Sequence, residues 1–546
     1  MTQDPFSRWE KRALWLLAAG YLIAISASVW LHRLPVRDMA HRYIPMAEAF
    51  AAGDWAYAFH PRIQPLQPVC GGIVAFLTGA DGFLALKIAS AFWAIAGGVL
   101  IFILFRELYR KERWVAVPGT VLCVFFPYMY HMAYSGLRES AKGCILIMLA
   151  LGLVRIRRES RSLNGFILVG IGAALASLVR AEMLAVGLFC LFTAGVFESA
   201  KERFPFRTAV TSLFVFGTIF LNMFLNAEFY RVAMPDVRFA QIFQQLTGRP
   251  AGIGDAMLLC AAGCLLLLVA AWGWAHLYRR IGRPGWIWGG VLTAAVGLAA
   301  YTALVAVHRA EPGFVGAFLD VLLKSFYYYV APIALIHVGA EIWRKRFSPE
   351  EHVILLVVAA NLLLCAMQTQ IFHRDLYLSP RYIFPATPLL FGFFILGVRD
   401  LYRWFLLILP RPVVNLMLLA AWGGLAVMYF YHAPQPLFRE YHHPRRLAEQ
   451  RFINRTKEII LGDYRQRHGE PEVNRSLWTY NSRRRPKIWF SDSSKITIAA
   501  CLTGGSITGE LREADYAVAE EAPGAVKKAI GKVSDGHHDY VIWRVR

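Results

Sequence analysis

Repeated apolar runs, each close to the ~20 residues that cross a bilayer as an α-helix, constrain this chain more than any other feature. Of its 546 residues, 57% are hydrophobic. A water-soluble domain does not bury so many apolar segments of this length, so the pattern predicts an integral membrane protein. The first run, 13–31, follows Arg8, Lys11 and Arg12 and has no small-residue cleavage site. These features indicate a retained helix rather than a signal peptide.

The apolar runs predict about thirteen transmembrane helices in an all-α membrane domain. They lie near 13–31, 83–105, 114–131, 140–156, 164–180, 183–198, 208–226, 257–278, 286–307, 320–341, 352–370, 382–398 and 412–431. Segment 67–79 is apolar too, but it is short and rich in Pro and Gly. We predict that it forms an interfacial or re-entrant helix.

The loops between these runs predict the orientation. With a cytoplasmic N-terminus, six successive inner loops are basic, as the positive-inside rule requires. The net charge of +21 is therefore interpreted as a topology signal and not as a nucleic-acid site. The chain is expected in the inner or plasma membrane with an extracytoplasmic C-terminus. The basic loop residues are Arg106, Arg110, Lys111 and Arg113; Arg155, Arg157, Arg158 and Arg161; Lys201, Arg203 and Arg207; Arg279, Arg280 and Arg283; Arg344, Lys345 and Arg346; and Arg399 and Arg403.

The composition changes abruptly at the end of the last apolar run. Residues 1–431 are predicted to form the membrane domain, and residues 432–546 a small soluble α/β domain outside the membrane. Short β-like runs and two helical candidates, near 445–468 and 522–532, support this interpretation. The β-like runs are Lys487–Phe490, Ile496–Ala499, Tyr516–Ala519 and Tyr540–Trp543.

Ionisable side chains gather at the predicted outer ends of the helices. Each one costs about 2.5–3.5 kcal/mol at membrane depth, so a group of them indicates a polar cavity. Cations in such a cavity suit a phosphate partly immersed in lipid, and arginine can hold it with two hydrogen bonds. The first outer loop, 32–66, supplies Asp38 and His60, and the other members are Lys87, Arg138, Glu139, Lys142, Arg180, Glu182, Lys324 and Arg381.

Local pairing is the alternative for each of these groups. Asp38 could cap a following helix and pair with Arg42. Glu139 could pair with its neighbour Arg138 or with Lys142, and Glu182 with Arg180. A lysine near a helix end could extend to the interface.

Three common enzyme motifs are absent from the sequence: it contains no GxxxxGK[ST] phosphate loop, no GxSxG elbow and no HExxH helix. The sequence also shows no cytoplasmic nucleotide-binding domain. We therefore expect that a donor substrate would reach the site through the membrane.

Several stretches in fixed order resemble glycosyltransferases of the GT-C fold, specifically the protein O-mannosyltransferase and aminoarabinose (lipid A) transferase group. The likeness covers most of residues 1–431. Met39 stands where relatives carry a second acid after the first. The matching stretches are Asp38 with Tyr43, Gly53-Asp54-Trp55, His60-Pro61, Pro65-Leu66-Gln67-Pro68, Lys87, Leu137-Arg138-Glu139, Leu178-Val179-Arg180-Ala181-Glu182 and Ser379-Pro380-Arg381-Tyr382-Ile383-Phe384-Pro385.

This resemblance implies an inverting transfer of a hexose or pentose from a polyprenyl-phosphate donor. The acceptor would be a hydroxyl or phosphate of a lipid, glycan or protein at the extracytoplasmic face. Asp38 would be the general base, and Glu139 would position the acceptor or support a divalent metal ion, a requirement that the sequence leaves open. The donor phosphate would meet Lys87, Arg138, Arg180, Lys324 and Arg381, and the sugar or acceptor pocket would include Tyr43, His60, Glu182 and Tyr382.

Two other classes of function remain alternatives. The same cavity could carry an anionic lipid or solute across the membrane, although the sequence shows no repeated halves of the kind that transporters contain. The chain could also be a non-catalytic assembly partner whose tail docks other proteins.

Overall fold

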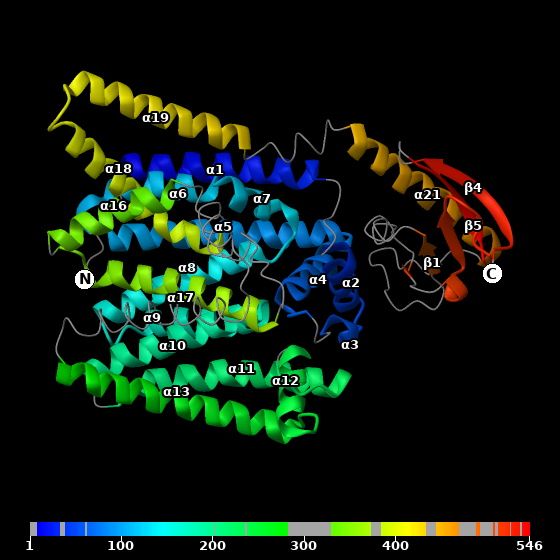
Figure 1. Ribbon diagram of the computed structural model, residues 1–546, viewed down its shortest axis with the longest axis horizontal. Coiled ribbons are helices and arrows are strands. Elements are labelled where there is room, and N and C mark those ends of the chain that lie inside the picture. Colours follow the sequence, from blue (N-terminus) through cyan, green and yellow to red (C-terminus); the bar gives the residue numbers. More distant parts are fainter. Residues whose placement is uncertain are drawn as a thin grey trace, which may run out of the picture.

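The computed structural model describes residues 8–32, 39–59, 63–202, 204–234, 237–281, 329–344, 346–372, 384–432, 444–468, 487–491, 506–507, 511–524, 526–534 and 538–545. Helices lie side by side in a bundle, and a small mixed sheet with its own helix forms the C-terminal part (Figure 1). The bundle helices are α1 (Arg8–Leu31), α2 (Ile44–Ala51), α3 (Trp55–Ala58), α4 (Leu66–Thr78), α5 (Gly82–Leu108), α6 (Ala116–Val124), α7 (Pro127–Ser135), α8 (Glu139–Arg158), α9 (Leu163–Val179), α10 (Ala181–Lys201), α11 (Phe206–Tyr230), α12 (Val237–Thr247), α13 (Ile253–Ile281), α16 (Val330–Trp343), α17 (Pro349–Phe372), α18 (Phe391–Phe405) and α19 (Arg411–His432).

The described helices include six that are long and apolar enough to cross a membrane, and a seventh if the bent pair α6–α7 counts as one. The protein is thus a multi-pass membrane protein. Of the predicted runs, 286–307 lies outside the described residues, so the total of thirteen stays a prediction. The six are the apolar part of α1, α5, α10, α11, the apolar part of α13, and the 3₁₀ turn η4 (Phe384–Leu390) continued by α18.

The predicted helix near 114–131 is broken in the structure. Helix α6 ends at Val124, α7 begins at Pro127, and the two are bent by 57°. Proline at the first position of α7 disfavours helical backbone in the residue before it, and Phe126 has ψ 122°. Mean hydropathy over the window does not detect this break. The bend directs α7 toward the N-terminal end of α8.

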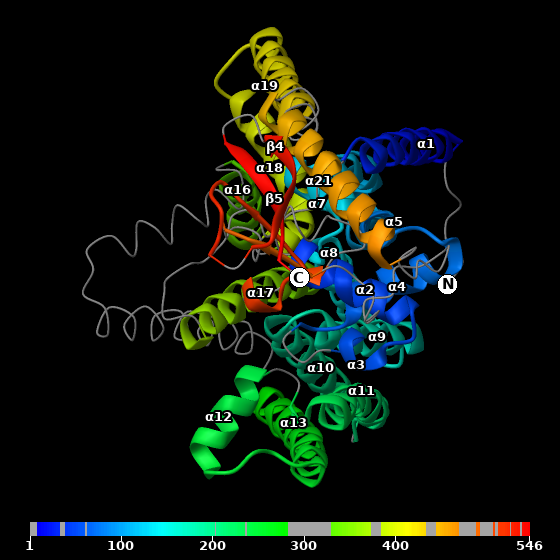
Figure 2. The same cartoon turned by 90° about the vertical axis from the view of Figure 1, so that its right-hand side faces the viewer.

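Close contacts between small residues hold the centre of the bundle together. Gly152 on α8 and Gly165 on α9 face each other, and a Cβ at Gly152 would lie 2.9 Å from the Gly165 carbonyl oxygen. Glycines in membrane helices permit such close backbone approach, which increases van der Waals contact. The end-on view in Figure 2 places α8 near the middle of the bundle, with α9, α10 and α11 below it.

The apolar segment predicted to be interfacial forms α4, a helix of 13 residues that ends at Gly79 in the left-handed region. It is far shorter than the bilayer-crossing helices, and it packs between α2 and α5. Its position relative to the membrane surface stays a prediction.

The tail contains a five-stranded sheet with the order β2-β1-β3-β5-β4. Strand β1 pairs in parallel with β2 and β3, and β5 pairs antiparallel with β3 and β4. Helix α21 (Pro444–His468) covers one face through Phe452, Ile460 and Tyr464. The strands are β1 (Lys487–Phe490), β2 (Ser506–Ile507), β3 (Tyr516–Ala519), β4 (Lys528–Ser534) and β5 (Asp539–Arg544).

The helix predicted near 522–532 is wrong, because strand β4 begins at Lys528. Its Lys and Ala residues favour helix when taken alone. Pairing with β5 and the contact between Gly531 and Ile459 of α21 instead hold this segment in the sheet. The run Ile496–Ala499 lies outside the described residues.

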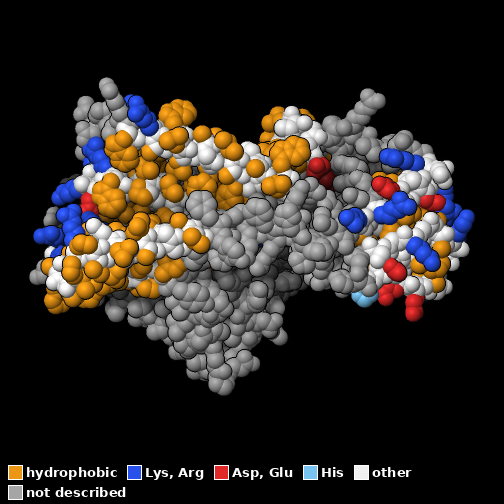
Figure 3. All heavy atoms as spheres, turned by 90° about the horizontal axis from the view of Figure 1, so that it is seen from above, with side chains coloured by type: hydrophobic (Ala, Val, Ile, Leu, Met, Phe, Trp, Pro, Cys, Tyr) orange, Lys and Arg blue, Asp and Glu red, His pale blue; other side chains and the backbone are white. Residues whose placement is uncertain are grey.

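Exposed basic side chains of the helical bundle gather at the end away from the tail. In Figure 1 the sheet lies at the right-hand end of the molecule. The space-filling view in Figure 3 shows a broad apolar surface over the helices, with Lys and Arg gathered at the left end of the bundle and Lys, Arg, Asp and Glu mixed on the tail at the right. We call this end of the bundle the basic end, and the end nearer the tail the tail end.

Candidate functional site

A tight turn brings the candidate site together at the tail end of the bundle. Helix α7 ends at Ser135, the next residue Gly136 has a φ of 80°, and Arg138 then leads into α8 at Glu139. Residues other than glycine rarely adopt this conformation. A Cβ at Gly136 would also meet the end of the Met39 side chain, which would have to move, so the backbone conformation is what requires glycine there.

Glu182, at the start of α10, is the buried partner of two cations. Its Oε1 atom lies 3.4 Å from Lys142 Nζ, and the two side chains are 1% and 0% exposed. Arg180 forms a second ion pair with the same carboxylate. The buried ion pair of Glu182 with Arg180, one of the two interpretations open from the sequence, is therefore present, and Lys142 extends it to α8.

Arg138 joins three elements of the site. Its Nη1 donates to Gln64 Oε1 at 3.2 Å and to the Val179 carbonyl at 3.2 Å. Its guanidinium also lies over the Tyr43 ring, 5.8 Å from the centroid. Arg138 therefore links the first loop, α9 and the segment before α2, and it holds Tyr43 in the same region as Arg180.

Glu139 differs from Glu182 in forming no ion pair at contact distance with any residue that the structure describes. It is only 2% exposed, and its Oε2 atom has no hydrogen-bond partner among the described residues. Its charge acts on the neighbouring Arg138, but without the close ion pair that Glu182 forms. Buried polar atoms are nearly always hydrogen-bonded, so an exception invites a functional explanation.

A hydrogen-bond network of uncharged groups holds the turn at Gly136 in place. Gln67 Nε2 donates to Ser90 Oγ at 2.9 Å and to the Gly136 carbonyl at 3.0 Å, and Ser90 donates to the Leu137 carbonyl at 2.9 Å. Sequence reasoning missed Ser90 and gave Gln67 no role of its own. The amide side chain of Gln67 within the short apolar helix α4 was the sequence feature that could have indicated this network.

Lys87 has contacts different from those expected of a phosphate ligand. Its Nζ donates to the Val29 carbonyl at 2.7 Å and to the His32 carbonyl at 2.8 Å, and it lies 4.3 Å from the Phe83 ring centroid. The last carbonyls of a helix lack partners within the helix, and a cation satisfies them well. Lys87 thus caps α1 and fixes its end against α5.

Five of the predicted site residues lie outside the described residues: Asp38, His60, Lys324, Arg381 and Tyr382. Their described neighbours lie close to the site. Met39 is 0% exposed and packs against Leu86 and Leu137. Phe384 stacks on Tyr128 of α7, with 3.9 Å between centroids.

One group in the described part of the chain could hold a metal ion. The ligand atoms of His337, Glu341 and Asp400 lie within 4.8 Å of one another. Asp400 Oδ2 is 2.7 Å from His337 Nδ1, and its Oδ1 is 2.9 Å from Arg399 Nη2, so both oxygens are already paired within the protein.

This group is remote from Glu139. Arg399 also pairs with Glu112, which follows the C-terminal end of α5. Lys87 and Ser90 lie near the opposite end of that helix, whose 27 residues extend about 40 Å. A metal held there would contribute to structure at the basic end and would not touch a substrate beside Glu139.

The chain resembles known proteins in three-dimensional structure and not in sequence. No family model matches the chain, and no curated protein matches it in sequence. The crystal structure of the Archaeoglobus fulgidus oligosaccharyltransferase in the apo form aligns over 90% of this chain with 14% identity and a TM-score of 0.51. This chain spans 64% of the length of that enzyme.

ArnT from Cupriavidus metallidurans also aligns, both in the apo state and bound to undecaprenyl phosphate. The apo structure has 13% identity and a TM-score of 0.41, and the alignment covers 97% of each chain. For the complex, the identity is 12% at the same TM-score and coverage.

The alignment with the oligosaccharyltransferase confirms the predicted structural similarity to glycosyltransferases of the GT-C fold. Because fold alone does not establish an activity, function must be argued from the site.

Proposed function

We propose that this protein is a membrane glycosyltransferase that moves a sugar from a polyprenyl-phosphate donor to an acceptor hydroxyl at the extracytoplasmic face. One observation carries the proposal: Glu139, a buried carboxylate that forms no hydrogen bond with the described part of the chain, lies in a site with Arg138, Lys142 and Arg180. The GT-C-like fold and the gathering of basic side chains at the opposite end support it.

Lys142 and Arg180 both pair with Glu182, and these contacts fix the geometry of α8 against α10. Arg138 and Arg180 lie at the start of α8 and of α10, where guanidinium groups can bind a phosphate with paired hydrogen bonds. Their charge would stabilise the polyprenyl phosphate as it leaves.

The transfer itself is a single displacement. The acceptor oxygen attacks the anomeric carbon, the bond from that carbon to the phosphate oxygen breaks, and the configuration inverts. Asp38, which directly precedes the buried Met39, takes the acceptor proton as general base. Glu139 accepts a hydrogen bond from the acceptor or the sugar, which gives its unpartnered oxygen a ligand. Polyprenyl phosphate is a sufficiently good leaving group to need no general acid.

Purified full-length protein in lipid nanodiscs tests this proposal. The protein is incubated with a panel of polyprenyl-phosphate hexoses and pentoses together with a membrane-lipid extract. Release of polyprenyl phosphate and the mass of any glycosylated acceptor are followed by mass spectrometry. We expect one donor to be consumed by the wild type and not by Asp38→Asn. Equal turnover by Asp38→Asn would remove Asp38 from the mechanism, and stability of the whole panel against folded wild type would contradict the proposal.

A further inference from the structure

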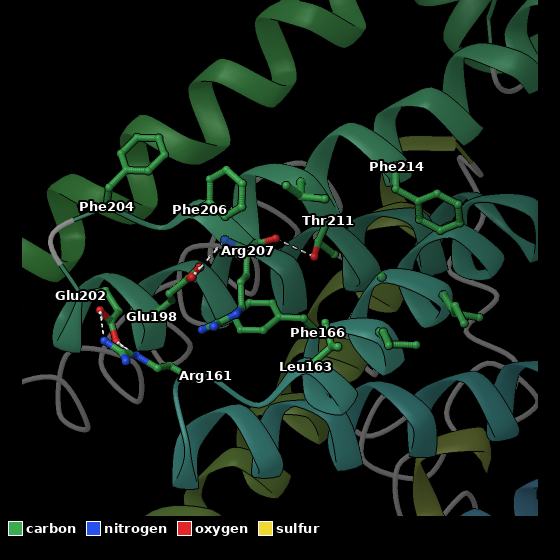
Figure 4. Close-up of a pocket in the computed structure, with 14 residues that line it drawn as sticks. Arg161, Leu163, Phe166, Glu198, Glu202, Phe204, Phe206, Arg207, Thr211 and Phe214 are labelled. Atoms are coloured by element: carbon green, nitrogen blue, oxygen red, sulfur yellow. Dashed lines mark hydrogen bonds and ion pairs between the residues drawn. The ribbon is translucent and has the colours of Figure 1, made fainter.

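A groove lies between α9 and α11, at the end of α9 opposite to Arg180 (Figure 4). It has room for about 640 Å³, within the 300–1,000 Å³ usual for small-molecule sites. We call it the α9–α11 groove. Most of its lining is apolar, and its main wall residues are Leu163, Phe166, Ile167, Phe206, Val210 and Phe214.

The groove exists because two helices meet closely at one point. A Cβ at Gly170 of α9 would lie 2.9 Å from Thr211 Cγ2 of α11. On either side of this contact the larger side chains diverge, and Ile167, Val210 and Phe214 remain exposed by 46%, 52% and 55%. Their exposed surface is continuous with the lipid-facing side of the helices, so the apolar part of the groove is open to an acyl chain.

The polar residues of the groove are confined to one end. In Figure 4, Arg161 and Glu202 lie at one end and Phe214 at the other. Arg161 binds Glu202 through two hydrogen bonds, 2.8 Å to Oε1 and 3.2 Å to Oε2. The hydrogen bond from Arg161 lowers the pKa of the Glu202 carboxyl, and the charges of Arg161 and Arg207 add to this effect. The pair therefore stays ionised and neutralises itself.

The second carboxylate of the groove is Glu198, and both of its oxygens accept hydrogen bonds within the protein. It accepts hydrogen bonds from the backbone N–H groups of Arg207 at 3.0 Å and Thr208 at 2.8 Å, and from the Thr208 hydroxyl at 2.7 Å. It thus satisfies the first N–H groups of α11. The Arg207 guanidinium itself forms no hydrogen bond or ion pair with any residue that the structure describes. The Arg207 guanidinium is half-buried and its charge acts on Glu202, but its hydrogen-bond donors are not taken by any described residue.

We propose that the α9–α11 groove binds an anionic phospholipid, with its phosphate on Arg207 and one acyl chain along Ile167, Val210 and Phe214. A charged end and an apolar length match an amphiphile. Basic pockets between membrane helices on the cytoplasmic side are suited to acidic headgroups, and this groove lies at the basic end. The 17 residues of α9 place the polar end of the groove about 25 Å from Arg180, so the proposed phosphate position is separate from the site proposed for sugar transfer.

Native mass spectrometry of the detergent-purified full-length chain tests the proposal. The protein is titrated with phosphatidylglycerol and, separately, with phosphatidylcholine of the same acyl chains. We expect phosphatidylglycerol to be retained preferentially and Arg207→Gln to weaken its binding about tenfold, the effect of losing one charge-assisted hydrogen bond. Arg110→Gln is the matched control, because Arg110 is an exposed arginine at the same end but outside the groove.

Two further measurements distinguish binding of the acyl chain from binding of the phosphate alone. Val210→Trp places a larger side chain on the groove wall and should reduce retention of the lipid without changing Arg207. Inorganic phosphate at millimolar concentration should not displace the lipid, because the acyl contacts would be missing. The proposal is overturned if phosphatidylcholine binds equally well, if Arg207→Gln or Val210→Trp binds like the wild type, or if inorganic phosphate competes.

Discussion

Lys142 Nζ lies 3.4 Å from Glu182 Oε1, and this contact joins α8 to α10 between two side chains that solvent scarcely reaches. Arg180 shares the same carboxylate. The three groups are linked through one carboxylate, and Glu139 on the first turn of α8 forms no such contact with any described side chain. The two glutamates should therefore respond in opposite ways to the same substitution.

Glu182→Gln should destabilise the protein. Removal of its charge takes this buried counterion from Lys142 and Arg180, a change that costs about 3–5 kcal/mol in buried pairs. Thermal unfolding of the purified protein, followed by differential scanning fluorimetry, measures this effect. An unchanged Tm would show that the two cations find another partner.

Glu139→Gln should abolish transfer and spare stability. The buried carboxylate has no hydrogen bond to lose, so the variant should unfold at a temperature no lower than the wild type. Turnover of the polyprenyl-phosphate sugar should fall by about 100-fold or more, the usual contribution of a positioned carboxylate. A lower Tm together with unaltered turnover would make Glu139 a structural residue.

Lys87→Met should separate a capping role from a phosphate-binding role. Loss of the bonds to the Val29 and His32 carbonyls should lower stability by about 1.5–3 kcal/mol, because hydrogen bonds from charged groups are worth that much. Binding of polyprenyl phosphate, measured by microscale thermophoresis, should stay unchanged. A tenfold weaker Kd would instead favour the phosphate contact predicted from the sequence.

The tail should lose stability in acid through Asp463. Burial alone would raise the pKa of its carboxyl, but hydrogen bonds from Tyr516 and Arg544 outweigh burial and lower the pKa below its ordinary value. Since the folded pKa is the depressed one, the stabilisation is complete above the unfolded pKa of about 3.9 and disappears as the pH falls through the lower folded value.

Pepsin digestion of the full chain between pH 2 and pH 5 checks this dependence. Release of tail peptides should increase steeply at the acid end for the wild type. Asp463→Asn should be cleaved more readily at pH 5 and should show a flatter pH profile. Parallel profiles for the two proteins would show that Asp463 does not control the transition.

Much of the fold could be predicted from the sequence because hydropathy reports burial directly. Helices such as α5, α11 and α13 are long apolar segments, and each was predicted within a few residues. The break before Pro127 was missed, since a single proline does not change the mean hydropathy of an apolar window. Strand β4 was missed because helix propensity counts residues singly, whereas the pairing of Lys528–Ser534 with the next strand and the contact of Gly531 with Ile459 decide the structure.

The site could be predicted in outline and not in detail. Topology alone placed Arg138, Glu139 and Glu182 at the same end of the bundle. It could not show that Glu182 forms close ion pairs with two cations while Glu139 forms none with the described residues, because that depends on side-chain geometry between helices. The contacts of Lys87 with the Val29 and His32 carbonyls at the end of α1 could not be predicted for the same reason, and its phosphate role stays a prediction.

The burial of Met39 against Gly136 limits which residues position 39 can hold. Members of the family that the first loop resembles carry a second acid at this position. Here a carboxylate at position 39 would lie in an apolar contact with Gly136 and Leu86, where burial of a charge costs free energy. The φ of 80° at Gly136 excludes most other residues there, so the turn offers no easy adjustment. A single substitution at position 39 would therefore not suffice to place an adjacent pair of acids in this loop.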